Sequence, residues 1–325
     1  MSNVTTPVPV GPGTIPRVTR SARLQRHEWL AVLGVAARSM RGRIGLSLAL
    51  LVVAIAVIGP FVAPHSATAF VSDLPFATPS GHYWLGTDVL ARDVLSRVLD
   101  GGWLLLIMAA AATILGVVVG ALAGVMAAYY RGWRDGLIMR IVDIILAFPA
   151  IVFALMLVSI AGPKLWLVVV AVAATHAPQV ARVMRAAALD ICEKDFVKAV
   201  ELNKVPSGKI IRGEILPNLV TPLMVETGLR LTWSIIIIAG LSFIGFGLQP
   251  PAPNWGLMLN ENRIGLVSNP WCIIAPAVLI ALLTIGVNTF TDAVARVSIG
   301  VERRVDEEQI VMREELPGRS AEPVL

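Results

Sequence analysis

Charged residues are scarce in this chain. Only 15% of its 325 residues are charged, whereas 56% are hydrophobic, and the mean hydropathy is +0.75. Soluble globular proteins carry about 25% charged and about 45–50% apolar residues. The surplus lies in runs long enough to cross a bilayer, which takes about 20 apolar residues in a helix. The composition therefore argues against an ordinary soluble domain and predicts an integral membrane protein.

Residues that carry metal or catalytic chemistry are also few. The chain has four histidines and two cysteines, Cys192 and Cys272, without metal-ligand spacing. We therefore expect no metal site and no catalytic residues. The topology predicted below puts the two cysteines on opposite sides of the membrane, too far apart for a disulfide. No G-x-x-x-x-G-K-[ST] phosphate loop occurs, so the chain is not expected to be an ATPase or to hold a cofactor.

Basic residues outnumber acidic ones, 27 to 22, and they lie mainly between the apolar runs. No basic stretch is interleaved with aromatic residues, so we expect no nucleic-acid partner. Cytoplasmic loops of membrane proteins are enriched in Lys and Arg. With the N-terminus inside, 22 basic residues fall on the cytoplasmic side and Arg230 falls within a span. Only four fall outside: Arg92, Arg97, Lys164 and Arg263.

Six apolar runs predict an all-α integral membrane protein with six transmembrane helices, in contact with the lipid bilayer and with both termini cytoplasmic. Residues 1–43, rich in proline and arginine, are expected to be a disordered basic N-terminal tail. The transmembrane domain is expected at 44–300 and a cytoplasmic tail at 301–325. The fourth run is short and contains His176 and Pro178, which suggests a helix break. The expected helices are Ile44–Ala63, Trp103–Ala128, Ile138–Ile160, Leu165–Ala181, Pro222–Leu248 and Trp271–Ala295.

A polar insert on the cytoplasmic side separates two of these runs. Its sequence at Lys198–Pro217 is KAVELNKVPSGKIIRGEILP, and Pro206-Ser207-Gly208 divides it. We expect two short helices at a sharp angle, the second ended by Pro217, forming a compact knob of about residues 196–217. The alternative is a solvated loop with no partner. On the first helix, Ala199, Leu202 and Val205 are spaced by three with Val200 alongside, next to a charged stripe of Lys198, Glu201 and Lys204.

The spacing of this insert resembles the EAA loop of bacterial ABC-importer permeases, which docks on the ATPase subunits. Lys198-Ala199-Val200 stand at the Glu-Ala-Ala positions, and Ile215-Leu216-Pro217 match the end of the motif. Lys204 stands where that family has a glycine, so we expect Pro206–Gly208 to supply the turn instead. The resemblance implies an ATPase-coupling role for these residues: Lys198, Ala199, Val200, Leu202, Lys204, Val205, Ile215, Leu216 and Pro217.

Two further stretches are similar to the C-type membrane subunit of dipeptide and oligopeptide permeases. One is Leu85–Leu99, LGTDVLARDVLSRVL, with Ala91 where that family usually has glycine. The other is Leu241–Leu259, LSFIGFGLQPPAPNWGLML. The resemblance covers about residues 40–300. It implies a bacterial inner-membrane permease that moves short peptides, with nickel, haem or other peptide-like cargo as alternatives.

The resemblance also implies the partners of such a permease. These are a paralogous second permease, two ABC ATPase subunits or domains that bind ATP and magnesium, and an extracytoplasmic substrate-binding protein. A stand-alone secondary transporter is the alternative from another class, and it would predict inverted repeats and ion ligands at mid-membrane. No convincing repeat is found in the sequence. A membrane-bound enzyme is less favoured, because no nucleophile–base set is apparent.

Two more groups of residues are candidates for function. Glu226 and Arg230 lie four residues apart within a span and predict a paired charge on one helix face, with separate snorkelling to the interface as the alternative. The outer loop after the fifth span is expected where a substrate-delivering protein would land, with Trp255 and Trp271 at the membrane interface. Its named residues are Pro250, Pro251, Trp255 and Gly256.

Small residues predict one close helix contact. Gly116, Gly120 and Gly124 form two overlapping GxxxG repeats in the second expected helix. Such repeats let helices approach closely in a membrane. Packing within this chain is the favoured interpretation, and a contact with a partner subunit is the alternative.

Overall fold

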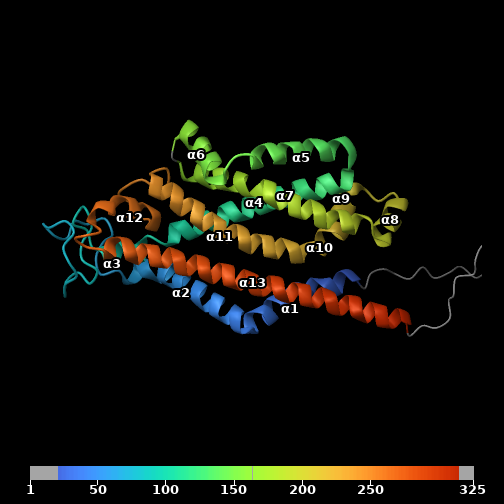
Figure 1. Cartoon of the computed structure of the whole chain (residues 1–325), viewed down its shortest axis with the longest axis horizontal. Helices are drawn as coiled ribbons and strands as arrows, with labels where there is room; N and C mark the ends of the chain where they lie inside the picture. The colour runs from blue at the N-terminus through green and yellow to red at the C-terminus, as the bar shows by residue number, and fades with distance from the viewer. Residues whose placement is uncertain (1–20, 163, 315–325) are drawn as a thin grey trace, which may run out of the picture.

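The structure is a computed structural model that describes residues 21–162 and 164–314. Within these residues the regular secondary structure is helical, and an isolated bridge between Thr87 and Asp93 is the only extended pairing. The helices lie roughly along one axis and form an elongated bundle (Figure 1). They are α1 Ser21–Arg38, α2 Met40–Val62, α3 Val94–Asp100, α4 Trp103–Tyr130, α5 Gly132–Leu146, α6 Ala150–Ala161, α7 Leu165–Cys192, α8 Asp195–Leu202, α9 Ser207–Ile210, the π-helix η2 Ile211–Ile215, α10 Leu216–Asn218, α11 Val220–Ile244, α12 Trp255–Glu261, the 3-10 helix η3 Arg263–Gly265, and α13 Trp271–Glu314.

Five helical segments of the described chain are long and apolar enough to cross a membrane. A sixth span is formed only if α5 and α6 count together, because they meet at 90°. The third predicted span, Ile138–Ile160, is therefore wrong as a straight helix. Pro149 explains the break, since proline has no N–H to donate and disfavours helical backbone at the preceding residue, Phe148. The bent pair still returns the chain from the end of α4 to the opposite end of the bundle, where α7 begins (Figure 1).

Helix ends depart from the predicted boundaries in several places. Residues 21–38 and 40–43 are helical rather than a disordered tail, and the expectation for 1–20 lies outside the described residues. Ser39 caps α2 by accepting a hydrogen bond from the Gly42 amide at 3.0 Å. At the other terminus α13 continues without a break through Glu314, so no structural boundary falls at residue 300. The rest of the predicted C-terminal tail, 315–325, is not described.

Two spans differ for local reasons. α7 runs through Pro178 to Cys192 without a break, so His176 and Pro178 do not interrupt it. α11 stops at Ile244 rather than Leu248, because Gly245 adopts the left-handed conformation with φ of 94°. A glycine in this conformation is a common helix terminator, since it carries no Cβ to clash.

The most extensive helix contact lies between α4 and α7. A Cβ added at Gly116, Gly120 or Gly124 would come within 3.0 Å of the backbone carbonyl oxygens of α7, at Ala173, Ala177 and Ala181. The GxxxG repeats therefore serve packing within this chain, as the favoured interpretation predicted.

The two ends of the bundle differ in content. The start of α1, the end of α13 and the short helices α8 and α9 lie at one end, while α3 and α12 lie at the other (Figure 1). The described ends of the chain thus share a side with the polar insert, as an even number of crossings requires. Cys192 lies at the insert end and Cys272 near the start of α13, and both are free.

Reporter fusions can test the predicted topology of six spans with both termini in the cytoplasm. A reporter that is active only in the cytoplasm should be active when it is fused after Arg304 and silent when it is fused near Ser268. The reason is the 22-to-4 excess of basic residues at the insert side. Activity at Ser268 would mean that the α5–α6 pair does not cross the bilayer and that the six-span topology is wrong.

Candidate functional site

The polar insert forms a knob at one end of the bundle, built from α8, α9, η2 and α10 (Figure 1). Its inner side is apolar. Val197, Ile210, Ile215 and Leu219 are almost completely buried and pack in one cluster with residues near the ends of α4 and α7, including Met184. Because burying such side chains stabilises the fold by roughly 1.5–3 kcal/mol each, the knob is anchored on these helices rather than left as a free loop.

The turn of the knob lies at Lys204. This residue adopts φ of 55°, and its amide donates to the Glu201 carbonyl at 2.9 Å. The expectation that Pro206–Gly208 replaces the missing glycine turn is therefore wrong. Lys204, which stands where the resembled family has a glycine, itself adopts the left-handed conformation. A lysine adopts this conformation at a cost of about 1–2 kcal/mol.

The second half of the knob is not one helix ended by Pro217. α9 is followed by the π-helix η2, in which the Leu216 amide donates to the Ile211 carbonyl, and helix continues through Pro217 to Asn218. Pro217 has no N–H, and its ring would clash with the carbonyl four residues earlier in a regular α-helix. The wider i→i+5 ladder accommodates it.

Not all of the predicted coupling residues face outward. α8 ends at Leu202, so Val205 does not continue the face of Ala199 and Leu202, and the predicted three-residue face is wrong. Val200, Val205 and Leu216 are half-buried against the base of the knob, and Ile215 is fully buried. Pro217 is half-buried as well. Leu202 is the one large apolar side chain of α8 that points into solvent, with 84% of its surface exposed. The outward-facing members of the predicted set are Lys198, Ala199, Leu202 and Lys204.

The paired charge within α11 is confirmed. Arg230 Nε lies 3.2 Å from Glu226 Oε2, and both side chains are largely buried. Arg230 Nη1 also donates to Gln179 Oε1 of α7. Side chains that reach to the interface separately would not meet in this way, so snorkelling is excluded. The pair joins α11 to α7.

A second polar chain continues this contact along α11. Ser234 Oγ lies 2.9 Å from His176 Nε2 of α7 and 2.9 Å from Thr113 Oγ1 of α4. All three residues are buried. Buried polar groups that are fully hydrogen-bonded specify one packing arrangement. α4, α7 and α11 are therefore held in register by polar contacts as well as by small residues.

Glu226→Ala should reduce assembly of the protein more than the double change Glu226→Ala with Arg230→Ala. Removing one partner strands a buried charge, which costs about 3–5 kcal/mol, whereas removing both does not. The yield of folded protein from membranes measures this, with thermal unfolding of the purified protein as a second readout. Additive effects of Glu226→Ala and Arg230→Ala would contradict the pairing.

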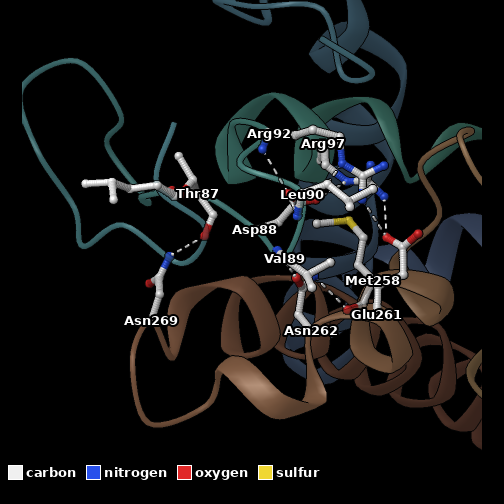
Figure 2. A network of polar contacts seen from close by, with 11 residues as sticks. Thr87, Asp88, Val89, Leu90, Arg92, Arg97, Met258, Glu261, Asn262 and Asn269 are labelled. Atoms are coloured by element: carbon white, nitrogen blue, oxygen red, sulfur yellow. Dashed lines mark hydrogen bonds and ion pairs between the residues drawn. The ribbon is translucent and has the colours of Figure 1, made fainter. Parts of the chain in front are cut away.

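The outer end holds a polar network that sequence reasoning missed. Asp88 Oδ2 lies 2.8 Å from Arg92 Nε and 3.3 Å from Arg97 Nε. Glu261 Oε2 of α12 accepts from Arg92 Nη2 at 3.0 Å and from Arg97 Nη2 at 2.7 Å. Figure 2 shows both guanidinium groups lying between the two carboxylates. The side chains of Arg92 and Arg97 are 2% and 0% exposed, so these outer charges belong to the interior of the fold.

Amide side chains extend this network. Asn262 Oδ1 accepts from the Val89 amide at 3.1 Å, and Asn269 Nδ2 donates to the carbonyls of Leu85 and Thr87 (Figure 2). The segment before α3 is thereby fastened to the loop around α12. The i, i+4 spacing of Asp88 and Arg92 was a sequence signal for part of this network, but Glu261 lies 169 residues from Arg92.

The outer loop also corrects one prediction. Trp255 is fully buried rather than at the membrane interface, and its Nε1 donates to the Val98 carbonyl at 2.8 Å. Its ring packs over Gly102, where any Cβ would clash. Gly256 is buried too, whereas Pro250 and Pro251 are exposed and Trp271 is 45% exposed.

Comparison with known proteins identifies the family of this chain. The family described as "Binding-protein-dependent transport system inner membrane component" matches residues 116–299. The chain is 34% identical over 249 residues to the dipeptide transport system permease protein DppC of Alkalihalophilus pseudofirmus, covering 77% of this chain and 82% of the relative. It is 37% identical over 244 residues to the glutathione transport system permease protein GsiD of Pectobacterium atrosepticum, covering 75% and 81%.

A solved structure shares the fold. It is an inward-facing conformation of the MetNI methionine ABC transporter, with a TM-score of 0.51 and 20% identity over 62% of this chain and 96% of that one. The family resemblance noted in the insert and the outer segments is confirmed by these comparisons. The chain belongs to the family of binding-protein-dependent transport system inner membrane components, the permease subunits of ABC importers.

Proposed function

We propose that this chain is one of two membrane subunits of a bacterial inner-membrane importer for short peptides, including glutathione-like peptides. The observation that supports it best is the knob, which presents Leu202 to solvent from a base anchored on α4 and α7. An exposed apolar residue on a rigid support is the kind of anchor that dominates protein interfaces. The relatives named as dipeptide and glutathione permeases favour peptide cargo over nickel or haem.

In this proposal the energy comes from partner ATPases. When ATP draws the two ATPases together, each docked knob moves with its partner. The knob joins α11 through η2 and α10 and contacts α4 and α7 through its buried base. Because α4 and α7 are packed at backbone distance, a shift of the knob moves them as one unit. The passage then forms between this chain and a second permease, and an external binding protein delivers the cargo.

Transport measurements test this function. The chain is reconstituted in liposomes with a second permease, the ATPases and a binding protein, and uptake of a labelled dipeptide, glutathione, nickel and haem is compared. We expect uptake of the peptides that needs ATP and stops with an ATPase variant that cannot hydrolyse it. Uptake by this chain alone, driven by a proton or sodium gradient, would instead show a secondary transporter and would overturn the proposal.

A further inference from the structure

An apolar groove lies where α1 and α2 meet the bundle. Its walls come from α1, α2, α11 and α13, and its volume is about 370 Å³. Leu33, Leu46, Met224 and Phe290 are among the lining residues. In Figure 1, α1 and α2 form a V whose tip points away from the other helices. The groove lies beneath this elbow.

The walls of the groove offer almost no free hydrogen-bonding groups. Thr227 and Thr291 are its two hydroxyl-bearing residues, and both hydroxyls are occupied. Thr227 Oγ1 donates to the Leu223 carbonyl at 2.7 Å, and Thr291 Oγ1 donates to the Val287 carbonyl at 2.8 Å. A peptide backbone in this groove would lose its hydrogen bonds to water without replacement, which is costly. Hydrocarbon would lose nothing, so the lining fits an acyl chain.

The elbow itself is cationic. Between Trp29 and Val62 the sequence holds three charged residues, and all are arginines: Arg38, Arg41 and Arg43. All three are exposed, and none takes part in an ion pair among the described side chains. The neighbouring part of α13 adds one exposed acid, Asp292, and one exposed base, Arg296, so the elbow keeps its positive charge.

The arginines of the elbow lie next to the groove. Arg43 is three residues before Leu46 on α2, so the two side chains are neighbours on one helix face, and Leu46 lines the groove. Large apolar side chains surround the arginines at the surface, with Met40 74% and Ile44 50% exposed. Arginines among exposed apolar residues are typical of segments at the boundary between headgroups and acyl chains. The topology puts this boundary at the cytoplasmic leaflet, which carries anionic lipid.

We propose that the α1–α2 elbow is a binding site for one anionic phospholipid of the cytoplasmic leaflet. Arg38, Arg41 and Arg43 hold the phosphate headgroup, and an acyl chain occupies the groove between α1, α2, α11 and α13. The bound lipid would extend the apolar contact that Val32 and Leu33 of α1 already make with Met224 and Val225 of α11. It does not depend on the cargo or on the ATPases, so it can be tested whether or not the transport proposal holds.

Native mass spectrometry of the full-length chain tests the headgroup contact. In micelles doped with equal phosphatidylglycerol and phosphatidylcholine, we expect retained phosphatidylglycerol to exceed phosphatidylcholine by about tenfold or more, given three arginines at the surface. The variant with Arg38→Gln, Arg41→Gln and Arg43→Gln should retain both lipids equally. A matched variant with Arg134→Gln, Arg140→Gln and Arg212→Gln loses the same charge elsewhere on the predicted cytoplasmic side and should keep the preference.

Two further measurements distinguish a bound lipid from free phosphate and test the acyl-chain contact. Leu46→Trp fills the groove without changing charge and should lower retention of both lipids. Millimolar inorganic phosphate should not displace the lipid; displacement by phosphate alone would show a free-phosphate site. A headgroup preference that persists in the elbow variant, or is lost equally in the matched variant, would overturn the proposal. Lipid retention unchanged by Leu46→Trp would overturn the acyl-chain contact.

A fluorescence measurement needs no charge variant. Trp29 lines the groove, so phosphatidylglycerol brominated on its acyl chains should quench it. The quenching difference between the native chain and Trp29→Phe isolates this residue from the other seven tryptophans. No difference would mean that no acyl chain enters the groove and would overturn the acyl-chain contact.

Discussion

Leu202→Asp should abolish stable association of the ATPases and, with it, transport. The side chain is 84% exposed and belongs to no buried cluster, so its change does not disturb the base of the knob. In the proposed complex it enters a groove on the ATPase, where a carboxylate would be buried without a partner. Interface anchors of this kind contribute about 2 kcal/mol or more, a loss of at least about thirtyfold in affinity. Co-purification of the ATPase in detergent measures the effect.

Two controls frame this result. Val267→Asp also replaces an apolar side chain by a carboxylate, at a position that is 96% exposed and lies at the opposite end of the molecule, and it should leave ATPase recovery unchanged. Lys204→Ala removes a charge from the exposed side of the knob. Its effect on ATPase recovery should be much smaller than that of Leu202→Asp, because charges at the rim of an interface contribute less than apolar anchors. Recovery of the ATPase at native yield with Leu202→Asp would show that the knob is not the docking element.

Glu261→Gln should destabilise the outer end of the protein by about 3–5 kcal/mol. The change leaves Arg92 and Arg97 buried with Asp88 as their one remaining carboxylate. A buried cation that loses its partner keeps its desolvation cost without compensation, which is the physical reason for the size of the effect. Thermal unfolding of the purified chain and protease cleavage in the segment before α3 measure it.

The control for this change is Glu193→Gln. Glu193 also pairs with an arginine, Arg131 at 3.3 Å, but both side chains of that pair are more than half exposed. Exposed pairs contribute about 0–1 kcal/mol, so this variant should unfold almost as the native chain does. Equal unfolding of the Glu261→Gln variant and the native chain would mean that the outer network is not a stabilising element.

The two predictions concern opposite ends of the same bundle. The knob has one apolar side facing the helices and one side facing solvent, which suits the docking role proposed for it. The outer network instead ties the segment before α3 to α12 through buried charges. The contacts between α4, α7 and α11 lie between these ends, through the glycine repeats and the chain of Thr113, His176 and Ser234.

The sequence by itself determined the features that depend on contiguous residues. Apolar runs of about 20 residues predicted five of the six spans. The free energy of transfer from water into the bilayer is summed over the side chains of one contiguous segment, so a local run is enough to identify a span. The position of the knob followed from its polar composition, and the pairing of Glu226 with Arg230 followed from helix geometry over four residues. The closeness of α4 to another helix followed from Gly116, Gly120 and Gly124, although not which helix it meets.

The tertiary structure decided which side chains face inward. Trp255 was expected in the interface but is buried over Gly102, and Val205 turns toward the base of the knob because α8 ends at Leu202. Glu261 finds Arg92 across 169 residues of sequence, a distance at which no local pattern specifies a partner. Local propensity and hydropathy act on neighbours along the chain, whereas burial and ion pairing depend on which helices pack together. The spans depend on local hydropathy and could be predicted from the sequence. The outer network depends on helix packing and could not.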